Sequence, residues 1–308
     1  MTAADVRAAV AVVGAGNMGG AMAARLCALG WPVVVCDIDP ARQQEARAAG
    51  ARLANTPLAA AQALAANGVL LVCVVDAAQS RAVLLGEGDS PGAVAGLQPG
   101  QTVMLCPTIA PEDTASLAAA LQTRGIDCID APLSGGPQRA RDGSMSLMVA
   151  APEGVLARHG ALLDALSSQV FRISERVGDG ARTKLVNNLL AGINLVGAAE
   201  ALALAGRLGL DQRTTLGVIE RSSGQSWIGS DRLHRALDGD VVPRAHMTLL
   251  EKDTRLAVQA ATEAGFAGPL GASAARAFAQ AARAGLANCD DGALLAWLQG
   301  PPLAQPEP

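Results

Sequence analysis

Short apolar runs recur along the first 150 residues, and most are separated by segments whose apolar positions follow a helical period. The apolar runs have the pattern of buried β-strands, whereas intervening segments such as 19–29, 41–48 and 111–123 predict helices. Alternating strands and helices favour a mostly parallel, doubly wound sheet. The predicted strands are residues 8–13, 33–37, 69–75, 102–106, 127–130 and 146–150.

The pattern changes after about residue 175, where the strand signals stop. Residues 181–208 form one helix-compatible segment that is too apolar for a solvated helix, so we expect it to be buried on most sides. We predict an α/β domain at 1–175 and an all-helical domain at 176–308, joined by this long interdomain helix. The Pro-rich segment 301–308 is expected to be disordered. Further helices are predicted at 211–222, 245–264, 272–284 and 292–298.

Composition narrows the class of protein. The 308 residues are 50% hydrophobic, enough for two domains with cores of their own. With 24 basic and 28 acidic residues, the net charge of -4 gives no electrostatic case for binding nucleic acid or an anionic membrane. The six cysteines lack CxxC and zinc-site spacing, so we expect reduced thiols and no metal site. We expect no signal peptide and no membrane span, hence a cytoplasmic protein.

A glycine motif follows the first predicted strand. In Gly14-x-Gly16-x-x-Gly19, the first glycine allows a tight strand-to-helix turn, the second lets a pyrophosphate approach the backbone, and the third lets the helix pack on the strand. Asn17 and Met18 complete the loop, whose amides would hold the phosphates at a helix N-terminus. By itself the motif is weak evidence for dinucleotide binding, but it lies between a predicted strand and a predicted helix. This context predicts a Rossmann-type dinucleotide-binding domain.

Asp37 ends the second predicted strand, 21 residues after Gly16, where a carboxylate accepts hydrogen bonds from the adenosine ribose. A carboxylate there repels a 2′-phosphate, which favours NAD, although NADP stays possible because Arg42 could pair with a phosphate. Asp37 could instead only cap the next helix. Asp39 precedes Pro40 and is the better N-cap candidate, which leaves Asp37 for the ribose.

Lys184 and Asn188 are four residues apart and share one face of the long predicted helix. A lysine can serve as acid or base if desolvation lowers its pKa towards neutrality, but spacing alone equally fits a lysine reaching to solvent from a packed helix. The chain has no tyrosine, which excludes the Tyr-x-x-x-Lys relay of short-chain dehydrogenases. Of the histidines, His159 is expected to be solvated, His234 lies in a charged helix, and His246 is expected at a surface or interface.

Four motifs in order resemble those of the β-hydroxyacid dehydrogenase family, which includes 3-hydroxyisobutyrate dehydrogenase. They are the glycine loop 14–19, Asp130-Ala-Pro-Leu-Ser-Gly-Gly136, Gly180-Ala-Arg-Thr-Lys-Leu-Val-Asn-Asn188, and Lys252-Asp253. The resemblance runs from Val10 to about Leu298. Segments around Val75–Gln79, Ser226-Trp227 and Asp238–Asp240 are most similar to the family's L-threonate dehydrogenase branch.

The resemblance implies roles for individual residues. It makes Lys184 the general acid/base, and it makes Asn188 a substrate-positioning residue. The loop of Ser134, Gly135 and Gly136 would bind the substrate carboxylate. Thr108 would lie near the nicotinamide, although many relatives have Ser-Thr where this chain has Pro107-Thr108, and Lys252 would approach the cofactor.

The expected function is therefore hydride transfer from the hydroxyl carbon of a small hydroxy carboxylate to NAD, with L-threonate or a related sugar acid as the substrate. One alternative is 3-hydroxyisobutyrate dehydrogenase activity. Another is an NADPH-dependent reductase of glyoxylate or of succinic or tartronate semialdehyde, which Asp37 disfavours. A distant alternative is a non-catalytic dinucleotide-binding module, against which Lys184 and Asn188 weigh. By analogy with the family, a homo-oligomer, dimer or tetramer, is expected.

Overall fold

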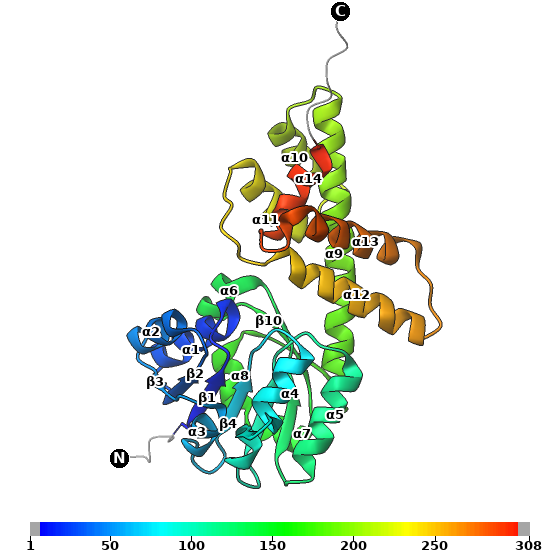
Figure 1. Ribbon diagram of the computed structural model, residues 1–308. Helices are drawn as coiled ribbons and strands as arrows, with labels where there is room; N and C mark the ends of the chain where they lie inside the picture. Colours follow the sequence, from blue (N-terminus) through cyan, green and yellow to red (C-terminus); the bar gives the residue numbers. More distant parts are fainter. Residues whose placement is uncertain (1–6, 301–308) are drawn as a thin grey trace, which may run out of the picture. The chain divides into compact units, whose positions relative to one another are not determined.

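The computed structural model describes residues 7–300, which form two compact units divided within one helix (Figure 1). The N-terminal unit comprises residues 1–184 and the C-terminal unit residues 185–308. The predicted tail 301–308 lies outside the described residues.

The described part of the N-terminal unit contains a sheet with the strand order β11-β10-β8-β7-β4-β1-β2-β3. From β3 to β8 all neighbouring strands are parallel, whereas β10 is antiparallel to β8 and also pairs with β9. The strands are β1 (Val10–Val13), β2 (Val33–Cys36), β3 (Arg52–Leu53), β4 (Val69–Val72), β7 (Thr102–Leu105), β8 (Asp127–Asp130), β9 (Leu133–Ser134), β10 (Ser146–Ala150) and β11 (Gln169–Ser174).

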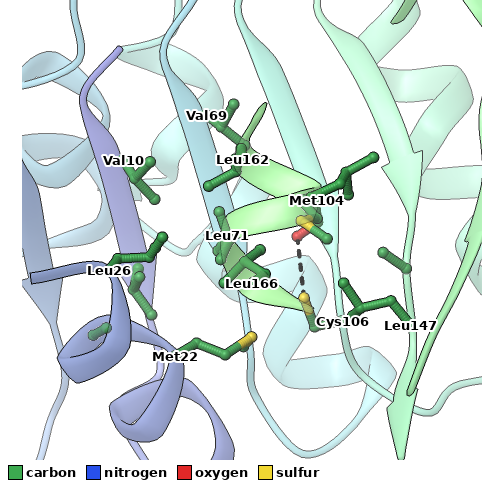
Figure 2. Packing of buried hydrophobic residues seen from close by; sticks show 14 of the residues in the cluster. Val10, Met22, Leu26, Val69, Leu71, Met104, Cys106, Leu147, Leu162 and Leu166 are labelled. Carbon is green, nitrogen blue, oxygen red and sulfur yellow. Dashed lines mark hydrogen bonds between the residues drawn. The ribbon is translucent and has the colours of Figure 1, made fainter. Parts of the chain in front are cut away.

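Helices cover both faces of this sheet, as a doubly wound fold requires (Figure 1). On one face Met22 and Leu26 of α1 pack with Leu162 and Leu166 of α8 against the strands (Figure 2). The other face packs against α3, α4 and α5. The helices are α1 (Asn17–Ala28), α2 (Pro40–Ala48), α3 (Pro57–Gln62), α4 (Ala77–Leu85), α5 (Pro111–Gln122), α6 (Gly136–Asp142), α7 (Glu153–Arg158) and α8 (Gly160–Leu166).

The predicted strands are all present, but the sheet contains more. The edge strand β11 carries no apolar run because its side chains are half exposed, so its sequence gives no strand signal. β5 (Gly86–Glu87) and β6 (Ser90–Pro91), which the sequence pattern does not predict, form a separate small hairpin. β3, β9 and β11 of the main sheet and the separate hairpin all lie outside the buried runs on which the prediction rested.

The expectation that His159 is solvated is wrong. His159 is buried, and its Nε2 lies 2.8 Å from the Thr102 hydroxyl at the start of β7. Burial, followed by the neighbouring Arg158, lowers the pKa of His159. A polar sequence neighbourhood concealed this inward position, which makes His159 a structural residue of the core.

The regular secondary structure in the described residues of the C-terminal unit is helical, apart from one bridge between His246 and Asp290. Its core contains the fully buried Phe278 together with Leu195 and Leu202 from the long helix. Asp211 and Ser226 cap α10 and α11 by accepting backbone N–H groups. The helices are α9 (Asp179–Arg207), whose first residues belong to the N-terminal unit, α10 (Gln212–Glu220), α11 (Trp227–Leu237), α12 (Met247–Glu263), α13 (Pro269–Ala281) and α14 (Leu294–Gln299).

Among the described residues, α9 is the one helix long and apolar enough to match a membrane span, with a mean hydropathy of 1.7. A core helix of a soluble protein meets the same criteria. Leu195, Ala199 and Leu202 of α9 belong to the core of the C-terminal unit, which accounts for part of this apolar character. Other apolar positions, such as Val186 and Leu190, are exposed, so α9 is less buried than its sequence predicted.

A buried carboxylate in the C-terminal unit gives a testable pH dependence of stability. Burial, with Asp290 beside it, raises the pKa of Asp291 to about 6, although Arg232 contacts one of its oxygens and opposes this shift. The folded state therefore holds a proton more tightly than the unfolded chain. This contribution to stability is full below about pH 4 and is lost as the pH rises through about 6.

We accordingly expect the free energy of unfolding of the wild type, relative to Asp291→Asn, to increase by about 1 kcal/mol between pH 7 and pH 5. Urea denaturation at several pH values measures the difference, and Asp89→Asn, in an exposed turn, is the matched control. A difference between wild type and Asp291→Asn that does not change with pH would contradict the shifted pKa.

Candidate functional site

The glycine loop lies between β1 and α1, where each of its glycines meets a different requirement. Gly14 has a positive φ of 91°, and a Cβ there would lie 2.5 Å from the carbonyl oxygen of Cys73. A Cβ on Gly19 would lie 1.9 Å from the carbonyl oxygen of Gly14. In contrast, a Cβ on Gly16 would meet no atom within 4 Å. The protein therefore needs Gly14 and Gly19 for its own packing, whereas the space beside Gly16 is open.

The open space beside Gly16 fits the pyrophosphate of a dinucleotide. Gly16 is the N-cap residue of α1 and has no side chain with which to cap this helix. Asn17 begins α1, and Met18 packs against the core of the sheet. An anion bound here would meet the N-terminal amides and the positive end of the helix dipole.

Asp37 stands beside this loop because β1 and β2 are neighbouring parallel strands. Its carboxylate accepts hydrogen bonds from the backbone N–H groups of Ala15 and, at 2.8 Å, Asp39. Asp39 itself caps α2 through the N–H of Ala41, as predicted. Asp37 is thus held in place, and lone pairs of a carboxylate beyond these two bonds can accept a ribose hydroxyl.

Arg42, the residue that kept NADP possible, also reaches the loop. One guanidinium nitrogen donates to Glu45 at 3.0 Å, and another lies 3.3 Å from Oδ1 of Asn17. Arg42 therefore links α2 to the cofactor loop.

The remaining predicted residues of the N-terminal unit follow other strands. Thr108 is half-buried after β7, and Ser134 lies in β9, paired with Ser146 of β10. Gly135 and Gly136 adopt φ values of 120° and 78°, which strongly favour glycine. Since the carboxyl ends of β2, β1, β7 and β8 lie at one edge of the sheet, the cofactor loop and Thr108 share the edge where open α/β sheets bind ligands.

Lys184 and Asn188 lie one turn apart on α9, and both are buried, with 6% and 7% of their surface exposed. The Asn188 amide donates to Oδ2 of Asp253 at 2.6 Å and accepts from the Asn187 amide at 3.0 Å. Lys184 is the last residue of the N-terminal unit, whereas Asn188 belongs to the C-terminal unit.

Asp253 is the residue whose part in the site the sequence analysis missed. It is buried and accepts from both Asn188 and Lys252, whose Nζ lies 2.7 Å from Oδ1. One carboxylate therefore fixes two predicted site residues within the C-terminal unit. The adjacent Lys252-Asp253 pair was visible in the sequence, but only the folded chain shows that Asp253 also holds Asn188.

The three histidines form their hydrogen bonds with residues outside this group. His159 bonds to Thr102, His234 to Glu220, and Nδ1 of His246 lies 3.0 Å from the carbonyl oxygen of Asn288. Within residues 7–300, no group of three or more His, Cys, Asp or Glu side chains could hold a metal ion.

A doubly wound sheet, an open glycine loop and a fixed acidic residue at the end of β2 define a dinucleotide-binding protein of the dehydrogenase type. Residues 9–174 match the family model for the NAD-binding domain of 6-phosphogluconate dehydrogenase. Residues 178–298 match the model described as NAD-binding of NADP-dependent 3-hydroxyisobutyrate dehydrogenase.

Comparisons over the whole chain support the same assignment. The chain is 34% identical to L-threonate dehydrogenase of Pectobacterium atrosepticum, over 95% of this chain and 94% of that one. A crystal structure of 3-hydroxyisobutyrate dehydrogenase from Salmonella typhimurium has a TM-score of 0.86 at 34% identity, covering 94% of this chain and 99% of that one. Psf3 in complex with NADP+ and 2-OPP has the same TM-score at 28% identity, covering 94% and 99%. The chain belongs to the NAD(P)-dependent β-hydroxyacid dehydrogenase family of 3-hydroxyisobutyrate dehydrogenase, which confirms the predicted family, fold class and cofactor type.

Proposed function

We propose that this dehydrogenase oxidises a small hydroxy carboxylate with NAD, that Lys184 is its general acid/base, and that L-threonate or a related sugar acid is its substrate. The observation that carries the proposal is the burial of Lys184 in the unit that also contains the glycine loop and the Ser134–Gly136 loop. Buried lysines are uncommon, and one in a dinucleotide-binding unit is a candidate for proton transfer.

The use of lysine in this chain supports the role. Of 24 basic residues only two are lysines, Lys184 and Lys252, and the rest are arginines. Arginine stays protonated in proteins, whereas a lysine can release its proton and take one up. A chain that otherwise uses arginine has lysine at the two positions that the family motifs assign to the site.

The proposed chemistry assigns one task to each group. The bound nicotinamide supplies the hydride acceptor. The amine of Lys184 takes the proton from the substrate hydroxyl. The backbone N–H groups of Gly135 and Gly136 and the hydroxyl of Ser134 bind the substrate carboxylate. Asn188, oriented by Asp253, positions the substrate oxygen, and Lys252 contacts the cofactor.

Asp37 supports NAD over NADP. Its carboxylate is fixed by two backbone N–H groups, so it cannot easily turn away from a 2′-phosphate. Arg42 lies nearby but is already paired with Glu45, which reduces the attraction it offers to an added phosphate.

We further propose that residues 1–175 bind the cofactor and that residues 176–308 serve substrate binding and oligomerisation in a cytoplasmic homo-oligomer. Exposed apolar side chains on α9 and in the loop before α13 support an interface between copies, because such side chains gain from burial. These side chains are Val186, Leu190, Leu204 and Phe266.

A substrate panel tests the proposal. Purified enzyme is mixed with NAD or NADP and with L-threonate, D-erythronate, D-glycerate, 3-hydroxyisobutyrate or L-serine, and formation of reduced nicotinamide is followed by absorbance. We expect NAD reduction with one four-carbon sugar acid and at least about tenfold lower kcat/KM with NADP. If none of these acids reduces NAD, while glyoxylate or succinic semialdehyde oxidises NADPH, the argument from Asp37 is overturned and the reductase alternative is selected.

A further inference from the structure

Asp130, the last residue of β8, is a buried carboxylate outside the proposed catalytic and binding groups. It is 1% exposed, and burial raises its pKa to about 6 against the lowering effect of backbone N–H groups. Its Oδ2 accepts hydrogen bonds from the N–H groups of Gly178, at 2.8 Å, and Ala181, at 3.0 Å. Gly178 directly precedes α9 and Ala181 lies in its first turn, 48 and 51 residues further along the chain.

These bonds make Asp130 an N-terminal cap supplied from the sheet. The first N–H groups of a helix lack partners within the helix, and a negative charge at this end also interacts favourably with the helix dipole. Gly180 permits the contact, since a Cβ there would lie 2.9 Å from Cγ of Asp130 and 2.7 Å from the carbonyl oxygen of Met148. The first turn of α9 is therefore hydrogen-bonded to Asp130 of β8, at a distance that leaves no room for a Cβ at Gly180.

Lys184 directly follows this hydrogen-bonded first turn in the sequence. It comes three residues after Ala181, so the two lie on one face of α9, and both are buried. A rotation or shift of the first turn therefore moves the Lys184 amine with it, because the helix is continuous.

Asp130 is also linked to the substrate loop. It stands four residues before Ser134, and the chain between them is held by hydrogen bonds from Ala131 to Leu105 and from Met148 to Pro132. The strand that ends in Asp130 thus leads through a fixed backbone into the Ser134–Gly136 loop.

We propose that Asp130 is a positioning residue of the reaction, whose carboxylate fixes the Lys184 helix relative to the loop that binds the substrate carboxylate. This inference rests on the proposed role of Lys184. It predicts that loss of the carboxylate misplaces the base without disturbing the cofactor loop, which lies between β1 and α1.

Kinetics of Asp130→Asn and Asp130→Ala test the inference, with Asp211→Asn as the matched control because Asp211 caps α10 through the N–H of Thr214 at 2.7 Å. Measured at a temperature where circular dichroism shows each variant folded, Asp130→Ala is expected to lower kcat by about 100-fold. Asp130→Asn, which keeps an acceptor oxygen, is expected to recover part of this loss. NADH affinity, followed by NADH fluorescence, is expected to change less than about twofold in either variant, and Asp211→Asn is expected to keep the wild-type kcat.

The two lysines provide a readout that does not depend on activity. Enzyme produced in a medium that contains 13C-labelled lysine gives labelled NMR signals from Lys184 and Lys252 only. Asp130→Asn is expected to shift the Lys184 side-chain signal and to leave that of Lys252 in place. An unshifted Lys184 signal or a wild-type kcat in folded Asp130→Ala would overturn the inference. If Lys184→Ala is inactive in the same assay, that result leaves the proposed function in place. If Lys184→Ala keeps full turnover, both the proposed function and this inference are refuted.

Discussion

Replacing Lys184 by alanine is expected to lower kcat by about 10³-fold while the affinity for NADH stays within about twofold of the wild type. The proton of the substrate hydroxyl must leave as hydride leaves the carbon, and without the amine only water could accept it. Lys184 lies on α9, whereas the glycine loop lies between β1 and α1, so its loss should not disturb cofactor binding. Steady-state kinetics and NADH fluorescence titration measure the two effects.

Lys184→Arg is the matched variant for this experiment. It keeps a long cationic side chain but cannot act as a base, because arginine does not deprotonate in proteins. We expect it to be as inactive as Lys184→Ala. Full activity in either variant would refute the role of Lys184, and a parallel loss of kcat and NADH affinity would indicate a cofactor role or misfolding instead.

Adding one methyl group is expected to leave stability unchanged at one glycine of the cofactor loop and to lower it at another. Gly16→Ala should fold as stably as the wild type, since its Cβ meets no protein atom and the φ of -60° at Gly16 is allowed for alanine. It should nevertheless weaken NADH binding by about 10- to 100-fold, because the methyl group would occupy the space a pyrophosphate needs. Thermal denaturation and NADH titration measure the two quantities.

Gly19→Ala is the contrasting variant. Its Cβ would lie 1.9 Å from the carbonyl oxygen of Gly14 and 3.1 Å from Cβ of Cys73, so α1 must move away from β1. We expect a loss of about 1–3 kcal/mol in the free energy of unfolding, with cofactor binding impaired as a consequence. If Gly16→Ala bound NADH normally, the pyrophosphate would not approach the loop at this residue.

The elements that carry the cofactor were predictable because local physics specifies them. The runs that form β1, β2 and β4 are apolar since both faces of the sheet are covered, and such strands have a continuous apolar signature. Asp39 before Pro40 identified the start of α2 for an equally local reason, because an N-cap bonds to amides two or three residues away. The half-exposed β11 and the small hairpin of β5 and β6 carry no such signature.

The sequence by itself determined the alternation of strands and helices, the glycine loop with Asp37, and the lysine and amide one turn apart on α9. Each of these follows from residues close together in the chain. Only the tertiary structure decided that His159 is buried against Thr102, that Asp253 orients Asn188 and that Asp130 caps α9. The partners in these contacts lie 48 to 65 residues apart. A buried polar group takes whichever partner the packing brings to it, and no local pattern records that choice.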